Sequence, residues 1–285
     1  MTCTNAGTVN TTGTDGIDAP ANNGNATTTN SGNVNVSGGH FGIRTTTDIG
    51  NAITSNQGTV TVNAAAATGI LTQVSSSGNA TTTNFGTITV TGTSQFVQLP
   101  GDSQTGGSGP FGSIGGNFGI LTAAASGNAT ATNYGTLSVS GAGGIGIETT
   151  AVAAPGTLPG AATVPSGGSA TTTNYGTVTV DGTNALPLTL PAEGIPTFGI
   201  AIGTTGILTT ASLGDATTVN NGIVNVTGFN STGISTRTVT GNATTINNGI
   251  VTVVGTVNNV PPQSASEAVA VRLASRPAQP AATPR

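Results

Sequence analysis

The sequence predicts an all-β fold: a right-handed parallel β-helix, or β-solenoid, of about eight three-sided rungs with loop insertions. Three observations lead to this prediction. One phrase recurs along most of the chain. Each copy holds apolar residues at every second position, which is the period of a β-strand. The chain is also rich in Gly, Thr, Asn and Ser, which are poor helix formers.

The recurring phrase reads close to Gly-Asn-Ala-Thr-Thr-Thr-Asn and runs on into a glycine and a Val-x-Val segment. Copies begin at Gly24, Gly50, Gly78, Gly127, Gly168, Gly214 and Gly241, with a partial copy from Asn5. Uninterrupted copies lie 26 to 28 residues apart. Strands of four to six residues with short turns fit three to such a repeat. One coil cannot bury its apolar side chains alone, so the copies must stack into a rod.

The first predicted strand of each rung is the Ala-Thr-Thr-Thr-Asn segment. The alanine is identical in every full copy, at Ala26, Ala52, Ala80, Ala129, Ala170, Ala216 and Ala243. The positions one and three residues later are sometimes apolar, as in Ile53, Val219 and Ile246. We expect these two positions to face the core.

An asparagine ends this first strand in every full copy. These residues are Asn30, Asn56, Asn84, Asn133, Asn174, Asn220 and Asn247. Asparagine two residues before glycine is typical of a turn, because its side chain bonds its own backbone. Stacked at one position, the amides can also hydrogen-bond from rung to rung. We therefore predict a structural Asn ladder at this turn.

The second and third predicted strands carry the larger apolar residues. The second holds the pairs Val34/Val36, Val60/Val62, Ile88/Val90, Leu137/Val139, Val178/Val180, Val224/Val226 and Val251/Val253. The third is a Gly-Ile-x-Thr segment around Ile43, Ile70, Ile120, Ile147, Ile200 or Ile207, and Ile234. Alternation places the paired residues on one face, stacked on those of the next rung about 4.8 Å away.

The chain divides into three parts. Residues 1–23 are a partial N-terminal rung or cap, residues 24–260 are the β-helix repeats, and residues 261–285 hold one more expected strand, 268–273, and a Pro/Ala-rich tail expected to be disordered. Three Gly/Pro-rich insertions, around 93–116, 151–167 and 183–196, lengthen some repeats. We expect them to be surface loops, because insertions are tolerated at turns.

The charge balance excludes several partners. Only 5% of the residues are charged, Lys is absent and the net charge is −4, so we expect no nucleic-acid partner. No apolar run is long enough for a transmembrane helix, and no signal-peptide pattern precedes the repeats. We therefore expect the chain to be a fragment whose export signal is missing from this sequence.

The residues that chemistry needs are few. Nine acids are scattered, no two at the same position of adjacent rungs, and each is expected in a solvated turn. His40 is the single His, expected in a surface turn, and Cys3 the single Cys, expected near a frayed terminus. Catalytic triads and zinc sites lack their ligands. We predict no catalytic, metal or cofactor site, and no enzyme.

An aromatic residue follows the ladder asparagine in three successive rungs, at Phe85, Tyr134 and Tyr175. In-register stacking makes these side chains a short row. Two interpretations stay open. Aromatic faces can stack on sugar rings, which makes the row a glycan-binding strip, or the rings stack on one another and stiffen the turn.

The turn and second strand together resemble a known class of repeat. The phrases NSGNVNV, NQGTVTV, NFGTITV, NYGTLSV, NYGTVTV, NNGIVNV and NNGIVTV are similar to the N-x-G-x-[VI]-x-[VI] phrases of bacterial autotransporter passengers and filamentous-haemagglutinin-like adhesins. The resemblance covers residues 5 to 260 and concerns the architecture more than one family. It implies an exported rod, monomeric, at the bacterial cell surface, associated with the outer membrane, or extracellular.

The resemblance also implies a function: adhesion to host-cell or matrix glycans or proteins. Two alternatives remain, a purely structural filament or spacer and, less favoured, a carbohydrate-binding or polysaccharide-active β-helix.

Overall fold

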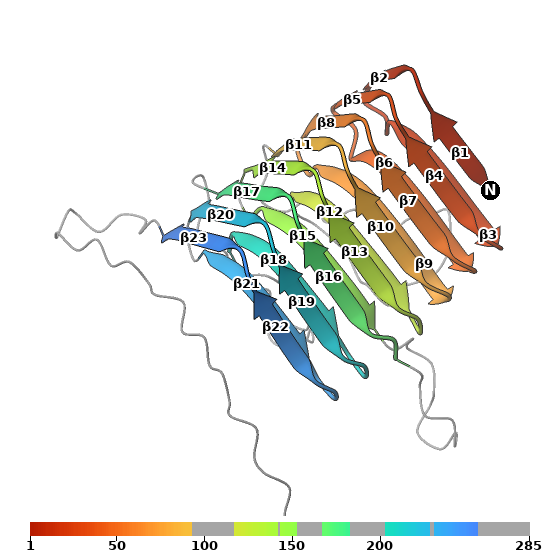
Figure 1. The fold of residues 1–285 in the computed structure, drawn as a ribbon. Helices are drawn as coiled ribbons and strands as arrows, with labels where there is room; N and C mark the ends of the chain where they lie inside the picture. Colours follow the sequence, from red (N-terminus) through yellow and green to blue (C-terminus); the bar gives the residue numbers. More distant parts are fainter. Residues whose placement is uncertain (93–116, 142, 153–166, 183–202, 229–230, 256–285) are drawn as a thin grey trace, which may run out of the picture.

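The computed structural model describes residues 1–92, 117–141, 143–152, 167–182, 203–228 and 231–255. These residues form β-strands and no helix. The chain winds as a right-handed coil (Figure 1). Three kinds of strand alternate along the chain and form three all-parallel sheets. Two sheets have eight strands and the third has seven, which confirms the predicted fold class.

The first sheet holds the Ala-Thr-Thr-Thr-Asn strands. They are β1 (Thr2–Asn5), β4 (Ala26–Asn30), β7 (Ala52–Asn56), β10 (Ala80–Asn84), β13 (Ala129–Asn133), β16 (Ala170–Asn174), β19 (Ala216–Asn220) and β22 (Ala243–Asn247). The second sheet holds the Val-x-Val strands. They are β2 (Thr8–Thr12), β5 (Asn33–Ser37), β8 (Thr59–Ala64), β11 (Thr87–Gly92), β14 (Thr136–Ser140), β17 (Thr177–Gly182), β20 (Ile223–Gly228) and β23 (Ile250–Gly255).

The third sheet holds the Gly-Ile-x-Thr strands. They are β3 (Ile17–Asn23), β6 (Phe41–Ile49), β9 (Thr68–Ser77), β12 (Phe118–Ala125), β15 (Ile145–Val152), β18 (Thr205–Ala211) and β21 (Thr232–Thr238). Residues 1–23 thus contribute a strand to each sheet. Ile147 pairs in register with Ile207, so Ile207, and not Ile200, is the isoleucine of the next third-sheet strand.

Equivalent residues of neighbouring rungs are paired without a shift in the first two sheets, as in Asn30 with Asn56 and Val34 with Val60. The alternating Val, Ile and Leu residues of the second sheet are buried and form the main core with the isoleucines of the third sheet. Each side chain therefore packs on a copy of itself one rung away. The spacing of about 4.8 Å is short enough to exclude water between them.

The predicted orientation of the first strand is wrong. Ile53 and Ile246 point outward and are 39% and 45% exposed, whereas Ala52, Thr54 and Asn56 of the same strand as Ile53 are fully buried. The reason is packing: the alanines fill a narrow seam against small residues of the third sheet, such as Ala124 and Ala151. An isoleucine would not fit that seam.

All seven third-sheet strands are longer than predicted, at 7 to 10 residues in place of four to six. They continue past the Gly-Ile-x-Thr segment because small and β-branched residues follow it. Ala151 and Val152, assigned to an insertion from the sequence, end β15. On the outward side of the third sheet, six large apolar side chains form a further buried cluster, separate from the main core and from the alanine seam: Phe41, Leu71, Phe118, Leu121, Ile145 and Leu208.

Several predictions lie outside the described residues. These are the insertions around 93–116 and 183–196, residues 153–166 of the insertion around 151–167, the strand expected at 268–273, and the tail to residue 285.

Candidate functional site

The candidate site is a corner of the rod, where each rung turns from the first sheet to the second. We name its outward side chains the corner column: Ser31, Gln57, Phe85, Tyr134, Tyr175, Asn221 and Asn248. Each column residue follows a ladder asparagine and precedes a glycine. Two backbone bonds to the previous rung fix the turn: the Tyr134 amide donates to the Asn84 carbonyl over 2.7 Å, and the Gly135 amide donates to it over 3.2 Å.

The ladder asparagines lie directly behind this column and are buried in the central rungs. Each side-chain amide nitrogen donates to the side-chain oxygen of the next asparagine, at 2.7 to 2.9 Å, from Asn5 to Asn247. Each also donates to the carbonyl of the glycine two residues on, as Asn133 does to Gly135 at 3.2 Å. The chain of amides runs through all eight first-sheet strands and holds the corner at constant spacing.

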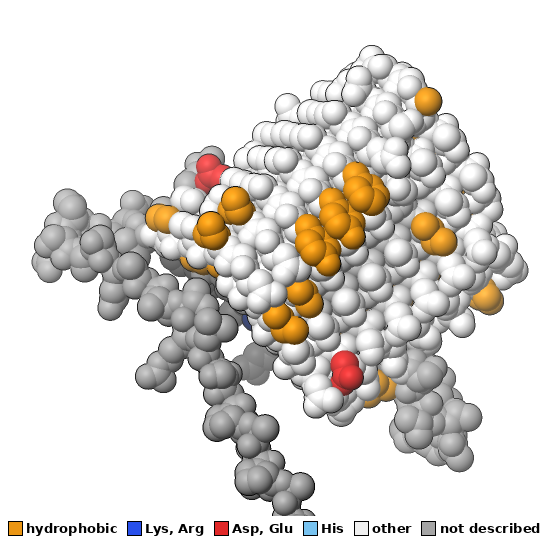
Figure 2. Space-filling model, in the orientation of Figure 1, with side chains coloured by type: hydrophobic (Ala, Val, Ile, Leu, Met, Phe, Trp, Pro, Cys, Tyr) orange, Lys and Arg blue, Asp and Glu red, His pale blue; other side chains and the backbone are white. Residues whose placement is uncertain are grey.

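The three aromatic side chains of the corner column stack on one another. The ring centres of Phe85 and Tyr134 are 4.8 Å apart at an angle of 3°. Those of Tyr134 and Tyr175 are 4.9 Å apart at 2°. Each residue is about half exposed, at 52% for Phe85, 48% for Tyr134 and 50% for Tyr175. Figure 2 shows hydrophobic patches on a face that is otherwise polar and nearly uncharged. The rings cover each other's faces and show their edges to solvent.

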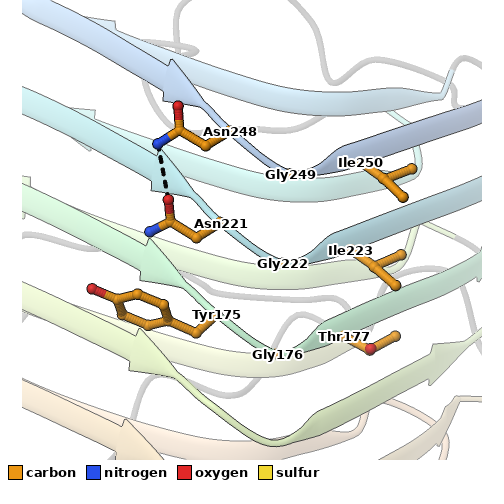
Figure 3. A pocket seen from close by; sticks show the side chains of 9 residues that line it. All are labelled: Tyr175, Gly176, Thr177, Asn221, Gly222, Ile223, Asn248, Gly249 and Ile250. Atoms are coloured by element: carbon orange, nitrogen blue, oxygen red, sulfur yellow. Dashed lines mark hydrogen bonds between the residues drawn. The ribbon is translucent and has the colours of Figure 1, made fainter.

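An open groove of about 450 Å³ begins where the stacked rings end. Tyr175, Asn221 and Asn248 line one wall, and Figure 3 shows them on three successive rungs. The other wall is formed by the first residues of the second-sheet strands, Thr177, Ile223 and Ile250, and the floor by Gly176, Gly222 and Gly249. The Asn248 side chain donates to the Asn221 oxygen at 2.9 Å. None of the nine lining residues is charged.

The residues singled out for chemistry lie elsewhere. His40 occupies a corner and is half-buried, and its Nδ1 lies 3.3 Å from the Ala66 carbonyl. Arg44, on β6, makes a paired contact with Asp18, at 2.9 and 2.5 Å, and lies 4.0 Å from Asp15. Cys3 is not frayed: it lies in β1 and packs against the main core.

Glu148 corrects the expectation that every acid occupies a solvated turn. It lies in β15, is 8% exposed, and is paired in register with Leu121 and Leu208. Burial raises the pKa of this carboxyl to about 7, opposed by the hydrogen bond that Thr150 donates to it at 3.1 Å. Sequence reasoning missed this site because a single acid in a repeat carries no pattern.

A second buried polar network escaped the sequence analysis. Threonine hydroxyls of the first and third sheets alternate down the inside of the rod, and we name them the hydroxyl chain. It runs through Thr28, Thr45, Thr54, Thr72, Thr82 and Thr122, and again through Thr149, Thr172, Thr209, Thr218, Thr236 and Thr245. Ala131 separates the two runs. The sequence contains a pattern that could have predicted the hydroxyl chain, because the Ala-Thr-Thr-Thr-Asn and Gly-Ile-x-Thr phrases each hold an almost invariant threonine.

Within the described parts of the chain, no three metal-ligating side chains come together, and no helix is long and apolar enough to cross a membrane. The sequence matches no protein-family profile, and comparison with curated proteins and with solved structures gives no match either.

Proposed function

We propose that the protein is a non-enzymatic rod that bacteria secrete or display at the cell surface, where it works as a stalk or adhesin segment in the manner of autotransporter passengers. The observation that carries this proposal is the uninterrupted stack. Eight rungs repeat the same contacts, and the Asn ladder crosses every one of them. Seven intervals of about 4.8 Å give a rod about 34 Å long over the described rungs.

The stack suits a stalk because its stability is additive. Each rung contacts only its neighbours, so rungs can be added without redesigning the core. The outward faces vary freely as long as the inward Ala, Thr, Asn and Val residues are kept. Such a scaffold can carry different contact surfaces at its corners and loops.

The arrangement of the acids supports a non-enzymatic role. Hydrolysis of glycosidic bonds needs two carboxyl groups facing one substrate. Glu148 is paired in register with leucines on both sides. Asp18 and Asp15 both lie beside Arg44, whose positive charge opposes theirs. No two acids of the described rungs are register partners.

Cell attachment tests the proposal. The full chain is immobilised on beads, and adhesion of the beads to epithelial cells and to extracellular matrix is counted. We expect attachment above that of beads carrying the same protein after heat denaturation. Equal attachment of folded and denatured protein would leave a purely structural spacer as the function.

A second measurement concerns the location. Antibodies against the rod should label intact bacteria that produce the protein or detect it in their medium. Detection only after lysis would contradict the proposed display.

A further inference from the structure

The outward face of the first sheet carries a regular array of threonines. In β1, β4, β10, β13 and β16, threonine occupies both outward positions of the strand, and in β19 and β22 it occupies the first of them. The rungs of β10, β13 and β16 form an unbroken block that is paired in register: Thr81, Thr83, Thr130, Thr132, Thr171 and Thr173. This sheet lies at the front of Figure 1, and Figure 2 shows it as a broad, flat face.

The outward hydroxyls of this block are available to solvent. The six side chains are partly exposed, and none of their hydroxyls bonds to another group in the described part of the chain. Inward threonines of the same strands differ, because Thr82 and Thr172 each bond to two hydroxyls of the third sheet. Strand pairing fixes the outward side chains in rows, and their β-branching limits their rotation. The face therefore presents fixed hydroxyls that bond only to water.

The spacing of these hydroxyls is close to that of water in ice. An O–H···O bond of about 2.75 Å in tetrahedral geometry places second-neighbour oxygens about 4.5 Å apart and gives a repeat of about 7.3 Å along the hexagonal axis. A prism face of ice displays both repeats. The threonines of the array lie about 4.8 Å apart from rung to rung and about 6.6 Å apart within a strand. Each spacing agrees with an ice repeat to within about a tenth.

We propose that the threonine array is an ice-binding face, which orders a layer of water in the pattern of a prism face and joins it to an ice crystal. Each hydroxyl can donate to one water and accept from others, as a water molecule of the lattice does. The methyl group beside it adds no competing hydrogen bond. This function is independent of the proposed adhesive role, because it uses the flat side of the rod and not its corners or loops.

The second sheet has outward threonines but not the same array. Asn35 and Asp181 occupy outward positions there, and Asn35 donates to Asn10 at 2.8 Å. A charged side chain holds water in a hydration shell of its own, which an ice lattice cannot include. On the first sheet, the outward positions of β4 to β22 that lack threonine hold neutral side chains: Ile53, Ser55, Val219 and Ile246. The first sheet is therefore the face that suits ice.

The experiment uses the full chain and a single ice crystal held in its solution. The measured quantity is thermal hysteresis, the gap between the melting and the freezing temperature of the crystal. Inhibition of ice recrystallisation in a frozen sample is the second measurement. We expect a gap that widens with protein concentration, a faceted crystal and slowed recrystallisation, all absent from protein-free buffer of equal osmolality.

Two threonines give a matched pair of variants. Thr130→Lys places a long, charged side chain in the middle of the array and should abolish the thermal hysteresis. Thr89→Lys is the control, because Thr89 is an outward, partly exposed threonine in the middle of a second-sheet strand. This variant should keep the activity. Thr171→Lys repeats the test at a second position of the array, and thermal unfolding shows that each variant compared is folded.

The outcomes decide the proposal without reference to adhesion. Loss of hysteresis in folded Thr130→Lys and Thr171→Lys, with activity kept in Thr89→Lys, supports the first-sheet face. Absence of hysteresis and of recrystallisation inhibition in the unchanged protein overturns it. Equal activity in Thr130→Lys and Thr89→Lys, whether kept or lost, also overturns it. None of these results alters the bead-attachment assay, so either function can fail while the other stands.

Discussion

At the scale of the residue, the Asn ladder concentrates stability in side chains that have no alternative partner. Asn133 accepts from Asn84 at 2.8 Å and donates to Asn174 at 2.9 Å, and all three are fully buried. Water cannot reach these amides, so removing one leaves its neighbours unsatisfied. A buried unpaired polar group costs about 1–3 kcal/mol.

We therefore expect Asn133→Ala to lower the free energy of unfolding by about 2–4 kcal/mol, because it removes an acceptor from Asn84 and a donor from Asn174. Denaturant unfolding measures the change. Asn133→Asp should be at least as harmful, since a carboxylate cannot donate. The control is Asn35→Ala, which removes an exposed rung-to-rung bond to Asn10 and should change stability by less than about 0.5 kcal/mol. Similar losses in the two alanine variants would contradict the ladder's role.

Glu148 predicts a pH dependence of stability. Its pKa in the folded protein is about 7, above its value in the unfolded chain, so the folded state holds the proton more tightly. The protonated carboxyl makes its full contribution to the free energy of unfolding below the pKa that Glu148 has in the unfolded chain. That contribution is lost as the pH rises to about 7. The change amounts to about 3 kcal/mol.

Glu148→Gln should remove this loss. The amide keeps an oxygen to accept from Thr150 and has no charge to desolvate. We expect the variant to be more stable than the unchanged protein at pH 8 and about equal to it at pH 4, by thermal unfolding at both values. If Glu148→Gln is less stable than the unchanged protein by the same amount at both pH values, the Glu148 carboxyl is not buried in solution.

At the scale of the element, the strands are positioned by what their glycines allow. Gly7 and Gly86 occupy the same corner position, but only Gly86 has a rung stacked before it. A Cβ on Gly86 would lie 1.9 Å from the Gly58 carbonyl oxygen, whereas a Cβ on Gly7 would meet nothing within 4 Å. Gly86→Ala should cost about 3 kcal/mol or more and Gly7→Ala less than about 0.5 kcal/mol, by denaturant unfolding. Equal effects would mean that local turn conformation, and not stacking, requires the glycine.

The hydroxyl chain predicts a stabilising substitution. Ala131 is paired in register with Thr82 and Thr172, whose hydroxyls bridge the first and third sheets. Ala131→Thr should place a hydroxyl between Thr122 and Thr149 and join the two runs. We expect a gain of about 0.5–1.5 kcal/mol in the free energy of unfolding.

The reverse change is the control. Thr82 bonds to both Thr72 and Thr122, and Thr82→Ala should cost about 1–3 kcal/mol. A loss in both variants would mean that the seam at Ala131 is too narrow for a β-branched residue.

The limits of sequence reasoning also lie at this scale. Periodicity places the second-sheet valines inside, because Val34 and its equivalents are apolar in every rung. It gives the first strand the wrong orientation, because the Thr and Asn side chains that face the core are polar and so do not look like core residues in the sequence. Their burial depends on partners from another sheet, as in the bond from Thr45 to Thr28 at 2.6 Å, and a local pattern does not contain those partners. The aromatic row shows a related limit: the sequence predicts that Phe85, Tyr134 and Tyr175 form a row, but only the structure shows that the rings stack face to face.

At the scale of the whole molecule, the rod behaves as a sum of equal units joined at equal interfaces. The same column positions recur in each rung, so any whole rung can be removed if the flanking ones still match. Deletion of residues 52–79 removes β7, β8 and β9 and joins Asn51 to Ala80, which restores the Gly-Asn-Ala-Thr phrase. Asn30 then meets Asn84, and Val34 meets Ile88, in the native register.

We expect this deletion to give a folded rod that is shorter by about 4.8 Å, with an unchanged β-type circular dichroism spectrum. Small-angle scattering measures the length, and denaturant unfolding should show a smaller surface-dependent slope. The control deletion, residues 52–66, removes only β7 and β8, so that a third-sheet strand follows another with no turn of the coil between them. That chain cannot restore the stack and should lose cooperative unfolding, because register is a property of whole turns. If both deletions fold equally well, the rungs are not the units of stability in this protein.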